Sequence, residues 1–294
     1  MTVVAGYLAG KVGLSGLHLA VRTARTLRTS LTVATIVPKP WLTPSRARID
    51  AEYEQWADHL AADSAKEAQQ HLDKVADGIE IDYCHRAHRS VAGGLIEVVE
   101  EVDAELLVLG SLPSGGRGQG QVVIGSTADW LLHSSPVPVV ISTRGYRGHT
   151  GKLSRVTCAY SAIPDAVDVV RRCFQSAKRF GVPARVISFA VRGRTMYPPE
   201  VGLDAEDSIL DAWASQAREN LENLKTDGVV GEDVVLQVVT GDDWQDALAA
   251  ADWEDGEILA LGTSPRGEIH RVFLGSRSAK IIRHSPVPVL VLPS

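Results

Sequence analysis

The sequence contains one unit twice, and this repeat constrains the fold more than any other feature of the chain. The segment HSSPVPVVIS at 133–142 matches RHSPVPVLVLP at 283–293. Upstream, VVIGSTADWLL matches VFLGSRSAKII, and Gly125 and Gly275 within these segments lie 150 residues apart. The chain is therefore expected to fold into two similar halves.

The repeat predicts two tandem domains, residues 1–147 and 148–294. Their junction lies near the Gly-, Arg- and Ser/Thr-rich segment 142–155. Gly110 and Gly262, which end AELLVLG and GEILALG, are 152 residues apart rather than 150. The first copy therefore carries two extra residues in the loop that follows this glycine.

Strand patterns alternate with helix patterns in each copy. In the first copy, continuous apolar and β-branched runs predict strands at TVVAGY, LTVATIV, IEIDYCHRA, ELLVLG and VPVVIS, with helices between them. Ser90 is the expected cap of the helix in VAGGLIEVVEEV. Because buried parallel strands form continuous apolar runs, each copy is predicted to be a doubly wound α/β sandwich with a five-stranded parallel sheet.

The composition excludes several classes of function. The 294 residues are 45% hydrophobic and 22% charged, which is typical of a globular protein, and the net charge of −6 is shared between the halves. No basic half or tail indicates nucleic-acid binding. The N-terminus lacks a cationic leader and is interrupted by glycines, so we expect no signal peptide, no membrane span and a cytoplasmic location.

The spacing of cysteines and histidines does not predict a metal site. Cys84, Cys158 and Cys173 are isolated, so we expect small core residues rather than a disulfide framework. His85 and His88 are expected to follow a strand, without an acidic or thiol partner at ligand spacing.

Most of the aromatic side chains outside the strands are expected to pack within the protein. Trp41 and Tyr197 lie in Pro-rich segments between the second strand and the long helix of each copy, where they either pack on that helix or close over a pocket. The tryptophans expected in helices and in the core are Trp130, Trp213, Trp244 and Trp253.

The loops resemble those of the universal stress protein family (UspA-like) over essentially the whole chain. The family signature is a strand ending in G-x₂-G-x₉-G-[ST], then a helix and a last strand introduced by P-x-P. Gly262, Gly275 and Ser276 occupy three of its four positions. The corresponding residues of the first copy are Gly110, Gly125 and Ser126. Since this order occurs twice, the chain is identified as a tandem member.

The resemblance implies a Rossmann-like fold of the adenine nucleotide alpha hydrolase type. It also implies that the closing strands Val137–Ile141 and Val287–Val291 pair antiparallel about an internal pseudo-twofold axis. Further dimerisation of the whole chain is left open by the sequence.

The resemblance further implies an adenine-nucleotide site, with ATP as the first candidate and no other cofactor. In members that bind ATP, backbone N–H groups of the glycine loop and of the next helix surround the phosphates. The candidate residues of the second domain are Gly262, Thr263, Ser264, Gly267, Gly275, Ser276 and Arg277. The weaker candidates in the first domain are Gly110, Ser111, Gly125, Ser126 and Thr127.

Both copies depart from the pattern of the ATP-binding members. The second glycine of the signature is replaced by Pro113 and by Pro265, which have no N–H to donate. The aspartate that such members carry after the first strand is replaced by Leu8 and by Ser161. The loop is therefore predicted to be a degenerate phosphate site.

The second domain is expected to hold any nucleotide better than the first, because cations near a helix N-terminus favour an anion. Its cationic residues are Arg266, His270, Arg271, Arg277, Lys280 and Arg283. The first loop has Arg117, and Asp129 lies in the first turn of its helix. A solvated helical face is the alternative interpretation of these arginines.

The predicted function is that of a stress-response module that senses a ligand or acts as a scaffold. One alternative is a member that has lost nucleotide binding and acts only through a protein partner, whose identity the sequence does not reveal. Another is a weak ATP hydrolase. The sequence contains none of the common nucleophile or metal-hydrolase motifs, so we expect no catalytic residues, no metal and no enzymatic activity.

Overall fold

The chain divides into two compact units, Met1–Lys152 and Leu153–Leu292. The computed structural model describes residues 2–10, 13–39, 47–112, 120–148, 150–163, 165–192, 203–265, 272–273 and 276–293. The antiparallel pairing expected between the closing strands of the two units stays a prediction.

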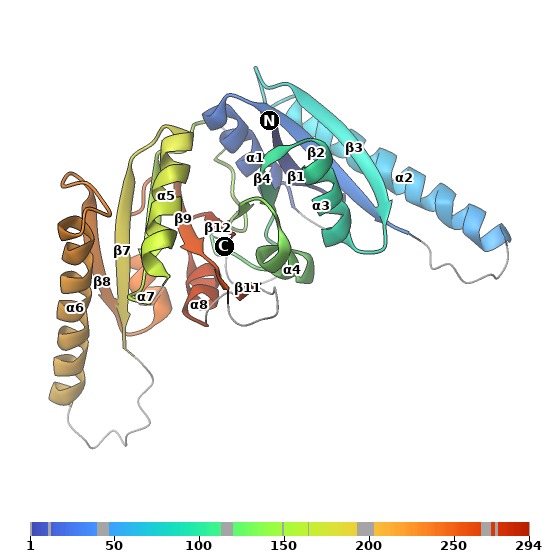
Figure 1. Ribbon diagram of the computed structural model, residues 1–294. Helices are drawn as coiled ribbons and strands as arrows, with labels where there is room; N and C mark the ends of the chain where they lie inside the picture. The colour runs from blue at the N-terminus through green and yellow to red at the C-terminus, as the bar shows by residue number, and fades with distance from the viewer. Residues whose placement is uncertain are drawn as a thin grey trace. The chain divides into compact units, whose positions relative to one another are not determined.

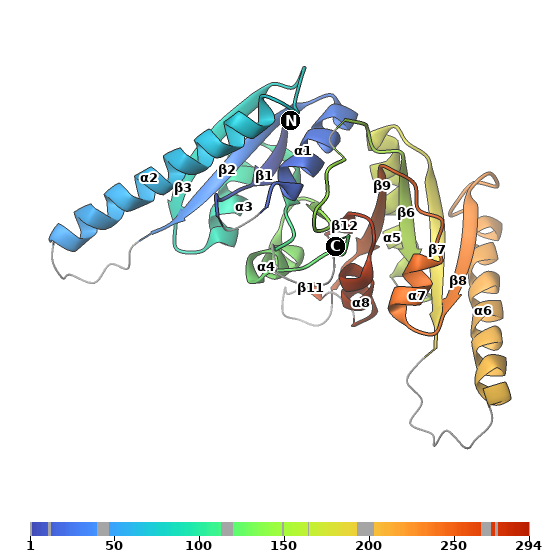
Figure 2. The same ribbon diagram turned by 180° about the vertical axis from the view of Figure 1, so that it is seen from behind.

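The first unit is a five-stranded parallel sheet with the strand order β3-β2-β1-β4-β5. Its elements are β1 (Thr2–Gly6), α1 (Ser15–Leu27), β2 (Ser30–Pro38), α2 (Ala47–Leu72), β3 (Ile81–His88), α3 (Val91–Glu101), β4 (Ala104–Leu109), α4 (Ser126–Ser134) and β5 (Val139–Ile141). In this unit α1 and α2 cover one face of the sheet, and α3 and α4 cover the other (Figures 1 and 2).

The second unit repeats this arrangement with the order β12-β9-β6-β7-β8, also parallel. Its elements are β6 (Arg155–Tyr160), α5 (Ala166–Phe180), β7 (Ala184–Val191), α6 (Leu203–Thr226), β8 (Val235–Gly241), α7 (Trp244–Ala249), β9 (Glu257–Gly262), β10 (Ser264–Pro265), β11 (Val272–Phe273), α8 (Ser276–His284) and β12 (Val289–Leu292). The short strands β10 and β11 form an antiparallel pair outside the main sheet, which the sequence patterns did not predict.

The predicted doubly wound α/β fold is confirmed. The central strands are buried on both faces, as Val3, Val4 and Leu107 illustrate in the first unit. Such burial explains why these strands are continuous apolar runs. The predicted cap is also confirmed, because the Ser90 hydroxyl accepts a hydrogen bond from the backbone N–H of Gly93 at the start of α3.

The prediction that Trp130 and Trp213 lie in the core is wrong, since their side chains are 50% and 51% exposed. Trp130 is on the outward side of α4, next to the buried Leu131, and Trp213 is next to the buried Ala214 on α6. One position along a helix rotates the side chain by about 100°, so an aromatic beside a buried residue can point to solvent. Trp244 and Trp253 are half-buried.

The position of two histidines differs from the sequence prediction, and several residues of interest lie outside the described part of the chain. His85 and His88 lie within β3 rather than after it. The residues of interest that lie outside the described residues are Trp41, Pro113, Arg117, Tyr197, Arg266, Gly267, His270, Arg271 and Gly275.

Candidate functional site

A cavity of about 420 Å³ opens in the first unit at the carboxyl ends of β1, β2 and β4. The residues that line it are Gly6, Tyr7, Leu8, Ala34, Ile36, Val91, Leu95, Leu109, Gly110, Leu112, Gly125, Ser126, Thr127 and Ala128. Strand β1 lies between β2 and β4, so the cavity is where the strand order reverses. In open parallel α/β sheets, this reversal point is the usual place for a ligand.

The structure brings four of the five first-domain candidates together at this cavity, namely Gly110, Gly125, Ser126 and Thr127. The fifth, Ser111, is not in the lining. Its buried hydroxyl donates to the carbonyl of Ser142 at 2.5 Å and accepts from the N–H of Val123 at 2.9 Å. The Ser111 hydroxyl therefore connects the end of β4 to Ser142 and Val123, and these internal hydrogen bonds occupy it.

The start of α4 supplies the polar end of the cavity. Gly125 occupies the N-cap position and Ser126 the first helical position, and no side chain caps the N-terminus of α4. The first backbone N–H groups of a helix lack intrahelical acceptors and carry a partial positive charge. Asp129 lies in the same first turn, so a phosphate there would meet a negative charge.

The rest of the lining is mainly apolar. Leu8 lines the cavity at the position where ATP-binding members carry an aspartate, and it is joined there by Ile36, Leu95, Leu109 and Leu112. A leucine side chain offers no acceptor to a ribose hydroxyl. The cavity therefore suits a flat, apolar group better than a charged one.

A polar contact attaches α2 to the rim of the cavity. The hydroxyl of the buried Tyr7 donates to the carboxylate of Glu67 at 2.6 Å, and the N–H of Ala9 donates to the hydroxyl of Ser64 at 3.1 Å. Burial, and then the hydrogen bond and charge of Glu67, raise the pKa of Tyr7 well above its usual value. Tyr7 thus stays neutral and holds α2 beside the cavity, a role that the sequence analysis missed.

In the second unit, part of the predicted loop is used for internal contacts. The Thr263 side chain is fully buried, and its hydroxyl donates to the carbonyl of Leu292 at 3.0 Å. A Cβ on Gly262 would lie 2.2 Å from a methyl group of Val169, so only glycine fits where β9 meets α5. These two residues join β9 to its neighbours.

The other described candidates of the second unit lie beyond the end of β9. Ser264 belongs to β10, and Ser276 and Arg277 begin α8, where both are exposed. Lys280 and Arg283 are also exposed on α8, which has no acidic residue in its first turn. The first turn of α8 is therefore more favourable to an anion than that of α4.

We also examined the described residues for metal-ligand clusters, disulfides and membrane-spanning helices. In the described part of the chain, no three His, Cys, Asp or Glu side chains are grouped as metal ligands. Cys84, Cys158 and Cys173 are free thiols, and burial raises the pKa of Cys173. Among the described helices, none combines the length and apolar character needed to span a bilayer.

Comparison with known proteins places the chain in a family. Residues 1–143 and 152–293 each match the Universal stress protein family. Universal stress proteins of Mycobacterium tuberculosis and Mycobacterium bovis are each 69% identical to the chain over 293 residues, covering 100% of both sequences. The crystal structure of a universal stress protein from Archaeoglobus fulgidus is 18% identical, with a TM-score of 0.59 over 99% of this chain and 98% of its own. The chain therefore belongs to the universal stress protein family and contains two copies of its domain.

Proposed function

We propose that the protein is a ligand-binding stress module whose first unit holds the base of an adenine nucleoside or nucleotide. The cavity at the reversal point of the sheet is the observation that carries this proposal. Its volume of about 420 Å³ lies within the range usual for small-molecule sites. An apolar wall with N–H donors at one end suits a heterocycle that presents ring nitrogens or a hydroxyl group.

We propose further that phosphate binding, where present, belongs to the second unit. Arg277 and Lys280 stand near the start of α8, whereas Asp129 stands in the first turn of α4. A nearby cation favours an anion at a helix N-terminus and a carboxylate opposes it. The two units would then differ in the ligand that they prefer, with the first favouring adenosine and the second favouring ATP.

Calorimetric titration with adenosine and with ATP tests both parts. Thr127→Trp places an indole in the first cavity and is expected to abolish adenosine binding. Arg277→Glu reverses the charge at α8 and is expected to weaken ATP binding by at least about tenfold, as loss of a charge-assisted contact implies. Each variant is the control for the other ligand.

Adenosine binding that survives Thr127→Trp would contradict the first-unit site. ATP binding that is insensitive to Arg277→Glu would contradict the second. Mass spectrometry of the purified protein under native conditions gives an independent check, because a bound nucleotide adds its own mass. ADP accumulating during incubation with ATP would instead favour the hydrolase alternative.

A scaffolding role is the second candidate function, and one observation favours it. Trp56 on α2 and Trp213 on α6 are each followed by a buried alanine, and their side chains are half-exposed. Exposed aromatic side chains are common at protein interfaces. If the protein acts through a partner, Trp56→Ala and Trp213→Ala should weaken that association while leaving adenosine titration unchanged.

A further inference from the structure

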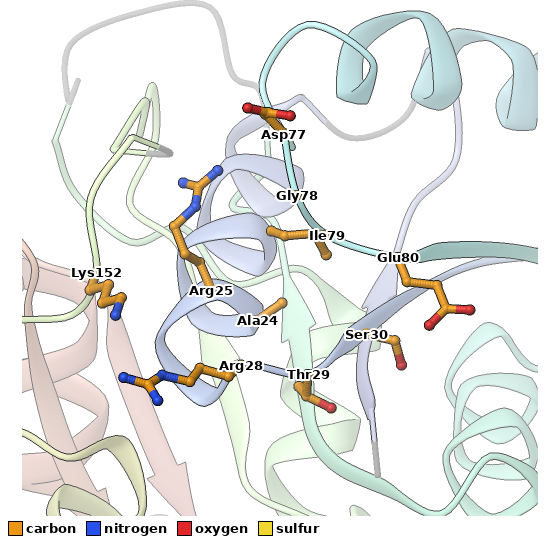
Figure 3. A pocket seen from close by; sticks show the side chains of 10 residues that line it. All are labelled: Ala24, Arg25, Arg28, Thr29, Ser30, Asp77, Gly78, Ile79, Glu80 and Lys152. Atoms are coloured by element: carbon orange, nitrogen blue, oxygen red, sulfur yellow. The ribbon is translucent and has the colours of Figure 1, made fainter.

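We infer that the first unit has a second binding site, which takes the oxyanion group of a small metabolite. The site is a pocket of about 450 Å³ formed by the end of α1, the start of β2, the turn before β3 and Lys152 (Figure 3). It lies at the amino ends of β2 and β3, whereas the cavity lined by Leu8 and Thr127 lies at the carboxyl ends of the strands, and the two share no lining residue.

Cationic side chains from two segments line this pocket. Arg25 is in the last turn of α1, Arg28 is the residue that follows that helix, and Lys152 comes from the end of the unit. Arg25 also donates to the carbonyl of Val75 at 3.4 Å. The side-chain nitrogens of Arg28 and Lys152, by contrast, have no hydrogen-bond or ion-pair partner among the described residues, and both side chains are exposed.

Arg28 and Lys152 lie apart from the two carboxylates that line the pocket (Figure 3). In Figure 3 the charged ends of Arg28 and Lys152 lie on one side, while Glu80 lies on the opposite side and Asp77 lies beyond Arg25. Within the described part of the chain, neither carboxylate forms an ion pair. In the proposed site a phosphate or carboxylate group contacts Arg28 and Lys152, and the carboxylates accept hydrogen bonds from hydroxyl or amino groups of the same ligand.

The backbone at Arg28 gives independent support. Arg28 has a φ of 55°, in the left-handed region, where a side chain is sterically disfavoured. At the equivalent place after α5, the second unit has Gly181 with a φ of 67°. A glycine is therefore sufficient for the fold at this position. The first unit keeps an arginine despite the strain, and its guanidinium borders the pocket.

The helix dipole alone does not account for this arginine. A cation in the last turn of a helix is favoured by the partial negative charge at the C-terminus. Arg25 already meets that preference in α1, as Lys178 and Arg179 do in α5. Each of these helix ends therefore has two cations, but only in the first unit does one of them occupy the left-handed position, which Gly181 holds in the second.

Titration with inorganic pyrophosphate and with citrate at low salt tests the site. Arg28→Gly installs the residue that the second unit uses, so the thermal midpoint should stay the same or rise. Affinity for the anion should fall at least about tenfold, since one charge-assisted contact is lost. Lys152→Ala should act in the same direction. Lys178→Ala, in the last turn of α5, is the matched control and should leave affinity unchanged.

Binding of pyrophosphate alone would identify a ligand that carries phosphate groups, binding of citrate alone a carboxylate, and binding of both a general oxyanion site. The inference is overturned if the wild-type protein binds neither probe up to about 10 mM. It is also overturned if Arg28→Gly and Lys152→Ala bind as tightly as Lys178→Ala. Thr127→Trp should not alter this titration, so failure of the adenosine site and failure of the oxyanion site are distinguishable.

Discussion

Replacing Glu257 by glutamine is expected to destabilise the second unit more than any surface change. Glu257 begins β9, and its carboxylate is fully buried. It accepts hydrogen bonds from Arg155 at 2.8 Å, from Nε of Arg185 at 3.1 Å, from the N–H of Glu254 at 2.9 Å, and from the hydroxyl of Thr157. Nη2 of Arg185 also lies 2.8 Å from the same carboxylate. One carboxylate thereby connects the neighbouring strands β6, β7 and β9.

The magnitude follows from what the substitution leaves behind. Removing one partner of a buried ion pair costs about 3–5 kcal/mol, because the remaining charge stays desolvated. Here the side chains of Arg185 and Arg155 are only 4% and 18% exposed. Glutamine retains one acceptor oxygen, so we expect the low end of the range, about 3 kcal/mol. Glu254→Gln is the matched control, because Glu254 also pairs with Arg155 but is 54% exposed.

Amide hydrogen exchange in increasing urea measures this loss unit by unit. In Glu257→Gln, amides of β6 and β9 should exchange through an opening that is about 3 kcal/mol easier than in the wild type. In Glu254→Gln the change should be below about 1 kcal/mol, as for an exposed pair. Equal losses in the two variants would refute the view that burial makes the Glu257 contacts strong.

Three further outcomes are expected. Burial alone would raise the pKa of Glu257, but hydrogen bonds from its arginine, threonine and backbone neighbours lower it below its ordinary value. The stability that Glu257 contributes should therefore be present above the ordinary pKa of glutamate and be lost as pH falls through the lowered pKa. A plot of unfolding free energy against pH should lack this acid-side loss in Glu257→Gln. Leu8→Asp adds an acceptor to the cavity and should tighten adenosine binding about tenfold by calorimetry, whereas weaker binding would show that the apolar wall matters more. The double variant Pro265→Gly with Ser161→Asp should bind ATP at least about tenfold more tightly than the wild type, while Pro113→Gly should change the affinity little. Equal, negligible binding by the wild type, the double variant and Pro113→Gly would mean that the prolines have no role in affinity.

The repeat carried most of the information about the fold. Aligning the copies indicated that strands end at Gly110 and Gly262 and that helices start near Ser126 and Ser276, and the structure has β4, β9, α4 and α8 at these places. These features depend on local patterns, namely continuous apolar strands, glycines at strand ends and prolines before the last strand. Local patterns survive in a single sequence, so they were predictable.

The use of individual polar groups was not predictable in this way. Ser111 was a binding candidate, yet its hydroxyl bonds to Ser142, 31 residues away in the sequence. Thr263 similarly bonds to Leu292, 29 residues away. Which hydroxyl is used internally depends on tertiary neighbours, and neither motif nor spacing contains that information. The Glu257 network was missed for the same reason, since its arginines lie 72 and 102 residues away.

The exposure of Trp130 could have been predicted from the sequence. The alignment of the copies places Trp130 of α4 at the same position as Lys280 of α8, because the two lie 150 residues apart. A position that holds lysine in one copy is typical of a helix surface. The exposure of Trp130 follows from that comparison, whereas the aromatic character of the residue suggested the core.

The same comparison between copies indicates where the two units have specialised. Some positions keep the same residue in both copies, as Gly125 and Gly275 do before the last helix. The next helical positions differ in charge, with Thr127 in one copy and Arg277 in the other. At the opposite end of the sheet, the left-handed position after the first helix is Arg28 in one unit and Gly181 in the other. Differences in charge at equivalent backbone positions leave the fold unchanged and alter what each unit can bind, so a duplicated chain of this kind can hold unlike ligands on one architecture.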